Sequence, residues 1–263
     1  MKASLPPLLS QENIDAVRIA GPHDVRRAAE ALHRISMDYA QMRAAPAHDI
    51  ADKRTPVDAD GAILARDVFG WPGDERAWWK NSRIALDSPL TTACRFESEP
   101  FWVNAEGFRT RHPNPYLDAI DLSHFESRAL TITAIVVPVH LPFGQIGAVS
   151  FNPTDRSKID LTEDFDKFSD AFGLYGRTFI SSYVRAMGHI QRLPAGSRLS
   201  KREVECLRWA AIGKTDLEIS MIMSRSRATI RFHIHNASLK LDAVNRSQTV
   251  FKAAQLGYLS LND

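Results

Sequence analysis

Apolar residues recur at helical spacing in four consecutive short segments near the C-terminal end of the chain. Each segment begins at a residue whose side chain can cap a helix: Ser200, Thr215, Ser226 and Asn245. In the first two segments a glutamate follows three residues later, which is the spacing of a capping box. The pattern therefore predicts four short helices.

The apolar positions of these segments are close enough together to form one small core. They include Val204, Leu207, Ile219, Ile222, Ile230, Ile234, Ala237, Leu241, Val250 and Ala253. About 65 residues can bury a core of this size, although a marginal one. Gly213 separates the first two segments, and glycine suits the left-handed position that ends many helices.

The rest of the chain mixes helical and strand patterns. Residues 161–187 have the apolar stripe of a long amphipathic helix, and residues 131–139 and 146–151 are β-branched and apolar, which is typical of a hairpin. The spacing further predicts helices over 24–37, 74–86 and 115–125, strands over 62–69 and 100–103, and a loop over 44–60.

These patterns predict an α+β chain. We expect helices around an antiparallel sheet in residues 1–187, a short linker over 188–198, and an all-α four-helix unit in residues 199–263. A sheet covered by helices can hold a ligand between its layers.

Charge is distributed unevenly between these parts. Residues 197–263 contain 11 Lys/Arg and 6 Asp/Glu, a balance of +5, whereas the remaining residues carry −3. A positive C-terminal unit suggests a polyanionic partner, and a solvated basic face is the alternative reading.

Composition and motifs argue against several other functions. The chain has 44% hydrophobic and 24% charged residues, no serine-nucleophile elbow, no phosphate-binding loop and no His-x-x-x-His pair. Cys94 and Cys206 have no metal-binding spacing. We therefore predict no enzyme activity, no metal and no cofactor. The absence of a long apolar run or a secretory signal predicts no membrane association and a cytoplasmic location.

The third helical segment carries basic residues outside its apolar stripe, on roughly one face. If the stripe faces the core, Arg227, Arg231 and His235 project outward one turn apart. Such a helix could read DNA in the major groove, with Arg231 contacting guanine in a bidentate manner and other cations contacting phosphates. The candidate DNA-binding residues are Lys201, Arg202, Lys214, Thr215, Arg225, Arg227, Thr229, Arg231, Phe232, His235, Lys240 and Arg246.

Short motifs in this region carry a family resemblance. They read R-E-x-E-x-L over 202–207, A-x-G-K-T-x-x-E-I over 211–219, T-I-x-x-H-x-x-N over 229–236 and N-R-S-Q over 245–248. The segment resembles the C-terminal helix-turn-helix domain of LuxR-type transcription regulators. The resemblance implies a dimer that binds a pseudo-palindromic site on double-stranded DNA. Asp242-Ala243 departs from the pattern, because the family commonly has glycine before the valine.

The N-terminal part is similar, more faintly, to the autoinducer-binding domain of the quorum-sensing branch of that family. Trp71-Pro72, the spacing from Asp87 to Trp102, and the hairpin with Ser150 carry the similarity. It implies an α-β-α sandwich in which Asp87 accepts the amide hydrogen of an acyl-homoserine lactone, Ser150 meets its amide carbonyl and Trp102 packs on its ring. The candidate ligand-binding residues are Trp71, Asp74, Trp78, Asp87, Trp102 and Ser150.

The family's lactone-binding tryptophan is replaced here. Aligned on Asp87 its position holds Asp74, and aligned on Trp71 it holds Glu75. An acidic group cannot donate to the lactone carbonyl, and one lost buried hydrogen bond costs about 1–3 kcal/mol. Two hypotheses follow. The first is a DNA-binding regulator controlled by a lactone or a non-lactone ligand. The alternative is a ligand-independent regulator, or an interaction protein that heterodimerises with a true quorum-sensing receptor and blocks it.

Overall fold

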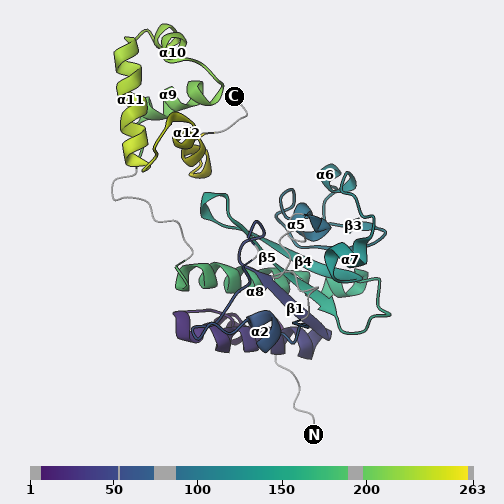
Figure 1. Cartoon of the computed structure of the whole chain (residues 1–263). Helices are drawn as coiled ribbons and strands as arrows, with labels where there is room; N and C mark the ends of the chain where they lie inside the picture. Colours follow the sequence, from purple (N-terminus) through teal and green to yellow (C-terminus); the bar gives the residue numbers. More distant parts are fainter. Residues whose placement is uncertain (1–6, 53, 74–86, 189–197, 260–263) are drawn as a thin grey trace. The chain divides into compact units, whose positions relative to one another are not determined.

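A computed structural model describes residues 7–52, 54–73, 87–188 and 198–259 (Figure 1). The chain divides into two compact units, residues 1–141 with 145–189 and residues 190–263 with 142–144. The boundary between the two units lies within residues 188–198. Most of these residues are outside the described part of the chain, so the linker predicted there stays a prediction.

The N-terminal unit is built on a five-stranded antiparallel sheet in the order β1-β5-β4-β2-β3. Its strands are β1 (Met42–Ala47), β2 (Phe101–Asn104), β3 (Gly107–Arg109), β4 (Thr133–His140) and β5 (Ile146–Pro153), with a short 3-10 turn, η2 (Pro142–Gly144), between β4 and β5. The predicted hairpin is therefore present and forms the centre of the sheet.

One face of the sheet packs against two long helices. These are α2 (Val25–Ala40), preceded by the 3-10 turn η1 (Pro22–Asp24), and α8 (Thr162–Ala186), with α1 (Gln11–Ala16) beside them. Ile135, Val137, Val149 and Phe151 point to this face, and Phe151 stacks on Phe172 of α8 with ring centroids 4.0 Å apart. The helices predicted over 24–37 and 161–187 are thus confirmed.

Glycine is required where α8 lies closest to the sheet. A Cβ added at Gly147 of β5 would stand 2.6 Å from a methyl carbon of Ile180 and 3.0 Å from the backbone oxygen of Ala47. Both distances are shorter than ordinary contacts. The absence of a side chain at Gly147 therefore allows the helix and the strand to pack this closely.

The other face of the sheet is covered by short helices. They are α5 (Pro89–Ala93), α6 (Pro115–Asp118) and α7 (Phe125–Ala129), while α3 (Leu64–Asp67) lies between β1 and this layer in the chain. Phe101, Val103 and Val136 point to this side and share a core with Cys94 and Phe125. Helices on both faces make the unit an α-β-α sandwich, as predicted.

Several element predictions were wrong. Residues 44–47 belong to β1 rather than to a loop, and residues 64–67 form α3 rather than a strand. The single helix predicted over 115–125 is two short helices, because residues 119–124 leave the helical pattern and His124 has φ 54°. The helix predicted over 74–86 lies outside the described residues.

The C-terminal unit contains the four helices predicted from its spacing. They are α9 (Lys201–Ala211), α10 (Asp216–Ile222), α11 (Arg227–Lys240) and α12 (Arg246–Gln255). All four predicted N-caps are present, and the first two are full capping boxes. Gly213 has φ 95°, which explains a glycine at the end of α9.

No helix among residues 7–52, 54–73, 87–188 and 198–259 is long and apolar enough to cross a membrane.

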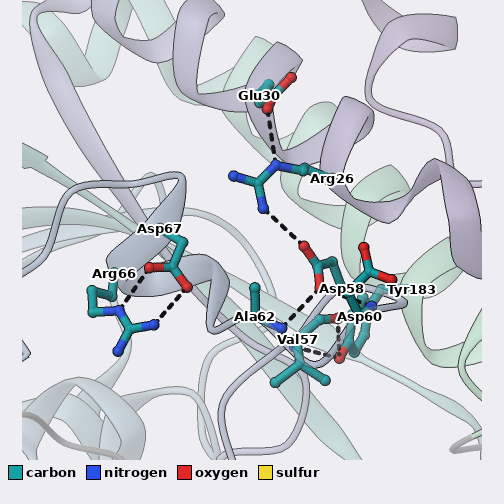
Figure 2. A network of polar contacts seen from close by, with 9 residues as sticks. All are labelled: Arg26, Glu30, Val57, Asp58, Asp60, Ala62, Arg66, Asp67 and Tyr183. Atoms are coloured by element: carbon teal, nitrogen blue, oxygen red, sulfur yellow. Dashed lines mark hydrogen bonds and ion pairs between the residues drawn. The ribbon is translucent and has the colours of Figure 1, made fainter.

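The buried carboxylate of Asp58 links the loop before α3 to helix α2 by hydrogen bonds (Figure 2). Its carboxylate accepts hydrogen bonds from the backbone N–H of Ala62 at 2.8 Å and of Asp60 at 3.0 Å, and from Arg26 of α2 at 3.0 Å. The hydroxyl of Tyr183 in α8 accepts from Val57 N–H at 2.9 Å. The loop is thereby held against both long helices, upstream of α3.

The Asp58 contacts should make folding sensitive to acid. Burial raises the pKa of Asp58, but the bonds from Ala62, Arg26 and Asp60 more than offset burial and hold the pKa below its ordinary value. The contribution of Asp58 to stability is therefore present above the unfolded-state pKa, about 3.9, and is lost as pH falls through the folded-state pKa.

We expect Asp58→Asn to lower the free energy of unfolding by about 1–3 kcal/mol at neutral pH, because one buried charged acceptor is lost. Chemical denaturation followed by far-UV circular dichroism measures the change. The matched control is Asp67→Asn, which removes the exposed ion pair with Arg66 shown in the same view and should change stability little. Equal losses in the two variants would contradict this role for Asp58.

Candidate functional site

A cavity of about 120 Å³ lies in the N-terminal unit, between the sheet and the layer of short helices. Ser150 of β5 is paired with Ala45 of β1 and Val136 of β4, so these three side chains point to the same face and form the cavity floor. The lining residues are Ala45, Ala47, Ile50, Asp52, Trp71, Ser88, Leu90, Thr91, Cys94, Arg128, Ala129, Leu130, Val136, Ala148, Ser150 and Asn152.

The small side chains of the sheet explain why this space is not filled. Ala45, Ala47 and Ala148 stand where larger residues would reach the opposite layer. The wall is mainly apolar and includes a few polar groups, among them Ser150 and Asn152. An apolar cavity with few polar groups is the usual form of a small-molecule site.

Ser150 and Asn152 make a small polar cluster at the cavity. The side-chain amide of Asn152 donates to the hydroxyl oxygen of Ser150 at 3.1 Å and to the backbone oxygen of Arg43 at 3.2 Å. The hydroxyl proton of Ser150 has no acceptor among the described residues. Ser150 can therefore donate to an acceptor placed in the cavity.

Trp71 lines the cavity, but its indole N–H is already in use. It donates to the backbone oxygen of Ala44 at 2.7 Å, and the guanidinium of Arg43 lies over the ring, 5.3 Å from its centroid. Trp71 therefore provides an apolar surface. In this arrangement it does not supply the hydrogen bond that the resemblance assigns to the replaced tryptophan.

The structure does not bring two other candidates to the cavity. Trp102 pairs with Ile135, which pairs with Phe151, so all three point toward α8 on the opposite face from Ser150. Trp102 therefore does not line this cavity, and its packing on a ligand ring stays a prediction. Asp87 is exposed and is absent from the lining, although its backbone oxygen accepts a bond from Arg128 at 3.0 Å. Asp74, Glu75, Trp78 and Trp79 lie outside the described residues.

Cys94 lines the cavity as an inert group. Complete burial raises the pKa of its thiol to about 12, so it stays protonated at neutral pH. Among the described residues there is no group of three or more His, Cys, Asp or Glu side chains that could hold a metal ion.

In the C-terminal unit, α11 separates an apolar face from a basic one. Ile230, Ile234, Ala237 and Leu241 are buried, as predicted. On the other side lie exposed residues, with Phe232 59% exposed and Arg231 62% exposed at its side chain. The exposed candidates in this unit are Lys201, Arg202, Thr215, Arg225, Arg227, Arg231, Phe232 and His235.

Two other predicted phosphate contacts are bound inside the unit instead. The ammonium group of Lys240 lies 2.8 and 2.9 Å from the carboxylate oxygens of buried Glu203 on α9. Arg246 pairs with Asp216 and donates to the backbone oxygen of Lys214 at 2.7 Å. Lys240 and Arg246 therefore link helices within the unit, and their contact with phosphate stays a prediction.

The remaining candidates keep their charge or hydroxyl near the surface. Arg231 makes one long contact, 3.3 Å from its Nε to Asp216, which leaves both terminal nitrogens without a partner among the described residues. Lys214 is half-buried beside Glu218 at 3.8 Å. Thr215 caps α10, and the hydroxyl of Thr229 lies 2.8 Å from that of Ser226.

Part of the chain matches a known protein family. The family described as "Bacterial regulatory proteins, luxR family" matches residues 197–253. The quorum sensing-dependent transcriptional regulator RpaR of Rhodopseudomonas palustris is 30% identical over 193 residues, covering 73% of this chain and 74% of RpaR. This chain belongs to the LuxR family.

Other family members match shorter stretches. The transcriptional activator VanR of Vibrio anguillarum is 34% identical over 128 residues, covering 47% of this chain and 50% of VanR, so the chain spans about half the length of that relative. A crystal structure of Escherichia coli SdiA is 25% identical with a TM-score of 0.44, covering 72% of this chain and 74% of SdiA. RpaR and VanR are transcriptional regulators, which agrees with the prediction that the chain is not an enzyme.

Sequence reasoning missed several residues that the structure places at these sites. Arg128 and Asn152 line the cavity, yet no motif marks either of them. Glu203 was recognised only as part of a capping box, whereas it also binds Lys240. A cavity lining and a contact between α9 and α11 depend on tertiary packing, which spacing along the chain does not specify.

The Glu203–Lys240 pair should contribute to the stability of the C-terminal unit. Burial raises the pKa of Glu203, but the bonds from Lys240 and from Ser200 more than offset burial and leave the pKa lowered. This contribution is present above the unfolded-state pKa, about 4.3, and is lost as pH falls through the folded-state pKa.

We expect Glu203→Gln to destabilise the C-terminal unit by about 1–3 kcal/mol at neutral pH, since the amide preserves the capping box but removes the buried charge pair. Hydrogen exchange measured by mass spectrometry on peptides of α9 and α11 localises the effect in the intact chain. The control Glu205→Gln removes the exposed pair with Arg202 and should leave exchange nearly unchanged. Unchanged exchange in Glu203→Gln would exclude a stabilising role for the pair.

Proposed function

We propose that this chain is a DNA-binding transcription regulator whose N-terminal unit binds a small-molecule signal. The outer face of α11 carries the DNA-binding part of this proposal. It combines a buried apolar stripe with exposed Arg227, Arg231, Phe232 and His235, which is the arrangement of a helix that enters the major groove.

The exposed side chains divide by the contacts that they can make. Arg231 has both terminal nitrogens available for a bidentate contact to guanine, and Phe232 can pack on a thymine methyl group. Arg225, at the turn before α11, and Lys201 and Arg202 on α9 are exposed cations suited to phosphates. The net charge of +5 over residues 197–263 supports binding to a polyanion.

The cavity carries the ligand-binding part. Its mainly apolar wall and the free hydroxyl proton of Ser150 suit an apolar molecule with an acceptor oxygen. An acyl-homoserine lactone is one such molecule. The exposed position of Asp87 and the occupied indole of Trp71 favour a related or non-lactone ligand.

Family membership supports a proposal for the assembly. We propose that two copies bind a pseudo-palindromic DNA site in the cytoplasm, with residues 1–187 as the sensing and dimerisation domain and residues 199–263 as the DNA-binding domain. A two-fold symmetric protein requires two half-sites about 34 Å apart, or a multiple of that spacing. Footprinting of the full chain on its own promoter region tests this arrangement. Failure to protect any site, with or without ligand extracts, would contradict it.

Arg231→Ala should cost about 1–3 kcal/mol on the specific DNA site and relax sequence preference, because a base contact is lost. The comparison is Lys214→Ala, which should weaken binding to all sequences and reduce the slope of log affinity against log salt by about 1. Fluorescence anisotropy with specific and scrambled duplexes at several salt concentrations measures both. Equal loss of specificity in the two variants would contradict this division of roles.

Native mass spectrometry of the protein purified from its own host separates the two hypotheses about the N-terminal unit. A small molecule bound in stoichiometric amount is the result that the cavity predicts. An empty protein that forms mixed dimers with a second receptor of the same family would favour the ligand-independent blocking role instead.

A further inference from the structure

Arg128 is the cationic group that faces the cavity at the end of α7. Its guanidinium donates hydrogen bonds to three backbone oxygens. Nε donates to Asp87 at 3.0 Å. Nη1 donates to Asp121 at 2.9 Å and to Ser123 at 3.0 Å. These contacts fix the plane of the guanidinium. Nη2, with two N–H groups, has no acceptor among the described residues.

The other donors in the lining are largely committed. The indole of Trp71 donates to Ala44, and both amide hydrogens of Asn152 are used. The Thr91 hydroxyl donates to the backbone oxygen of Ser88 at 3.0 Å. Among the described lining residues, Arg128 is therefore the strongest hydrogen-bond donor still available to a molecule in this cavity.

The charges near Arg128 leave the cavity suited to an anion. Asp121 lies 2.9 Å from Nη1, but its side chain is 67% exposed, so water screens this pair. Asp52, whose carboxylate lines the cavity, is bound to Arg54, and bonds from Arg54 hold the pKa of Asp52 below its ordinary value despite burial. The guanidinium side chain is 27% exposed, where a charge-assisted bond is stronger than in water.

The backbone on both sides of α7 holds Arg128 in place. His124 before the helix and Leu130 after it both have left-handed conformations, with φ 54° and 57°. Such angles are uncommon for residues other than glycine, and residues held in them cluster at ligand-binding segments. Leu130 itself lines the cavity. The short helix thus presents a fixed cation and an apolar side chain to the same space.

We propose that Arg128 binds the carboxylate of a small apolar acid whose tail lies against Ala45, Ala148 and Val136. This inference rests on the proposed signal-binding role of the cavity and names the ligand class. One carboxylate oxygen accepts from Nη2, and Ser150 provides a second donor within the same cavity.

Octanoate and octanamide test the assignment, because they have the same tail and nearly the same size but differ in head-group charge. Isothermal titration calorimetry of the full chain should show octanoate binding about tenfold or more tightly, the effect of one charge-assisted hydrogen bond. Arg128→Gln should bring the two affinities to within about twofold of each other. Arg95→Gln is the control, because Arg95 is exposed and absent from the lining.

Arg128→Lys covers the case in which Arg128→Gln does not fold: it keeps the positive charge and should retain part of the preference for octanoate. Equal affinity of the wild-type chain for the two probes, binding of neither probe, or an unchanged preference in Arg128→Gln would overturn the proposal. Fluorescence anisotropy in the same samples measures DNA binding independently of ligand binding. Failure of the Arg128 proposal can therefore be distinguished from failure of the proposed function. A chain that binds DNA but shows no preference for octanoate refutes only the role of Arg128.

Discussion

The alternation of side chains along β4 and β5 determines which residues of the N-terminal unit can meet a ligand. Successive residues of a strand point to opposite faces, so Phe151 must face α8 if Ser150 faces the cavity. A shift of one residue in register would exchange the two faces. The packing of Phe151 on Phe172 and the close approach of Ile180 to Gly147 hold this register. The cavity is therefore a consequence of how the opposite face is packed.

A comparable division occurs along α11 with a helical period. Ile230 and Ile234 turn one side of the helix into the core, and this leaves Arg227 and Arg231 on the other side. Buried Glu203 binds Lys240 at the end of the same helix, which fixes α11 against α9. In each unit the buried face sets the position of the face that we propose to bind a partner.

The sequence was informative where a feature is local or periodic. The four C-terminal helices, their caps and the outward position of Arg231 follow from spacing alone. Residues 44–47 were misread because Ala and Pro have weak strand preference, and only pairing with β5 makes them a strand. The spacing from Asp87 to Trp102 matched a family pattern, yet strand register directs Trp102 away from the cavity. Spacing along the chain does not mark Arg128, because its proposed role depends on backbone oxygens of three other residues that only the fold brings together.

Site-specific photo-crosslinking to DNA tests the central claim, that the outer face of α11 reads DNA. A benzophenone amino acid would be introduced in the full chain at His235 on α11 and, as a control, at Phe251 on α12, a residue that is also exposed. We expect position 235 to crosslink to a duplex carrying the specific site and position 251 not to crosslink. Crosslinking from position 251 with none from position 235 would contradict it.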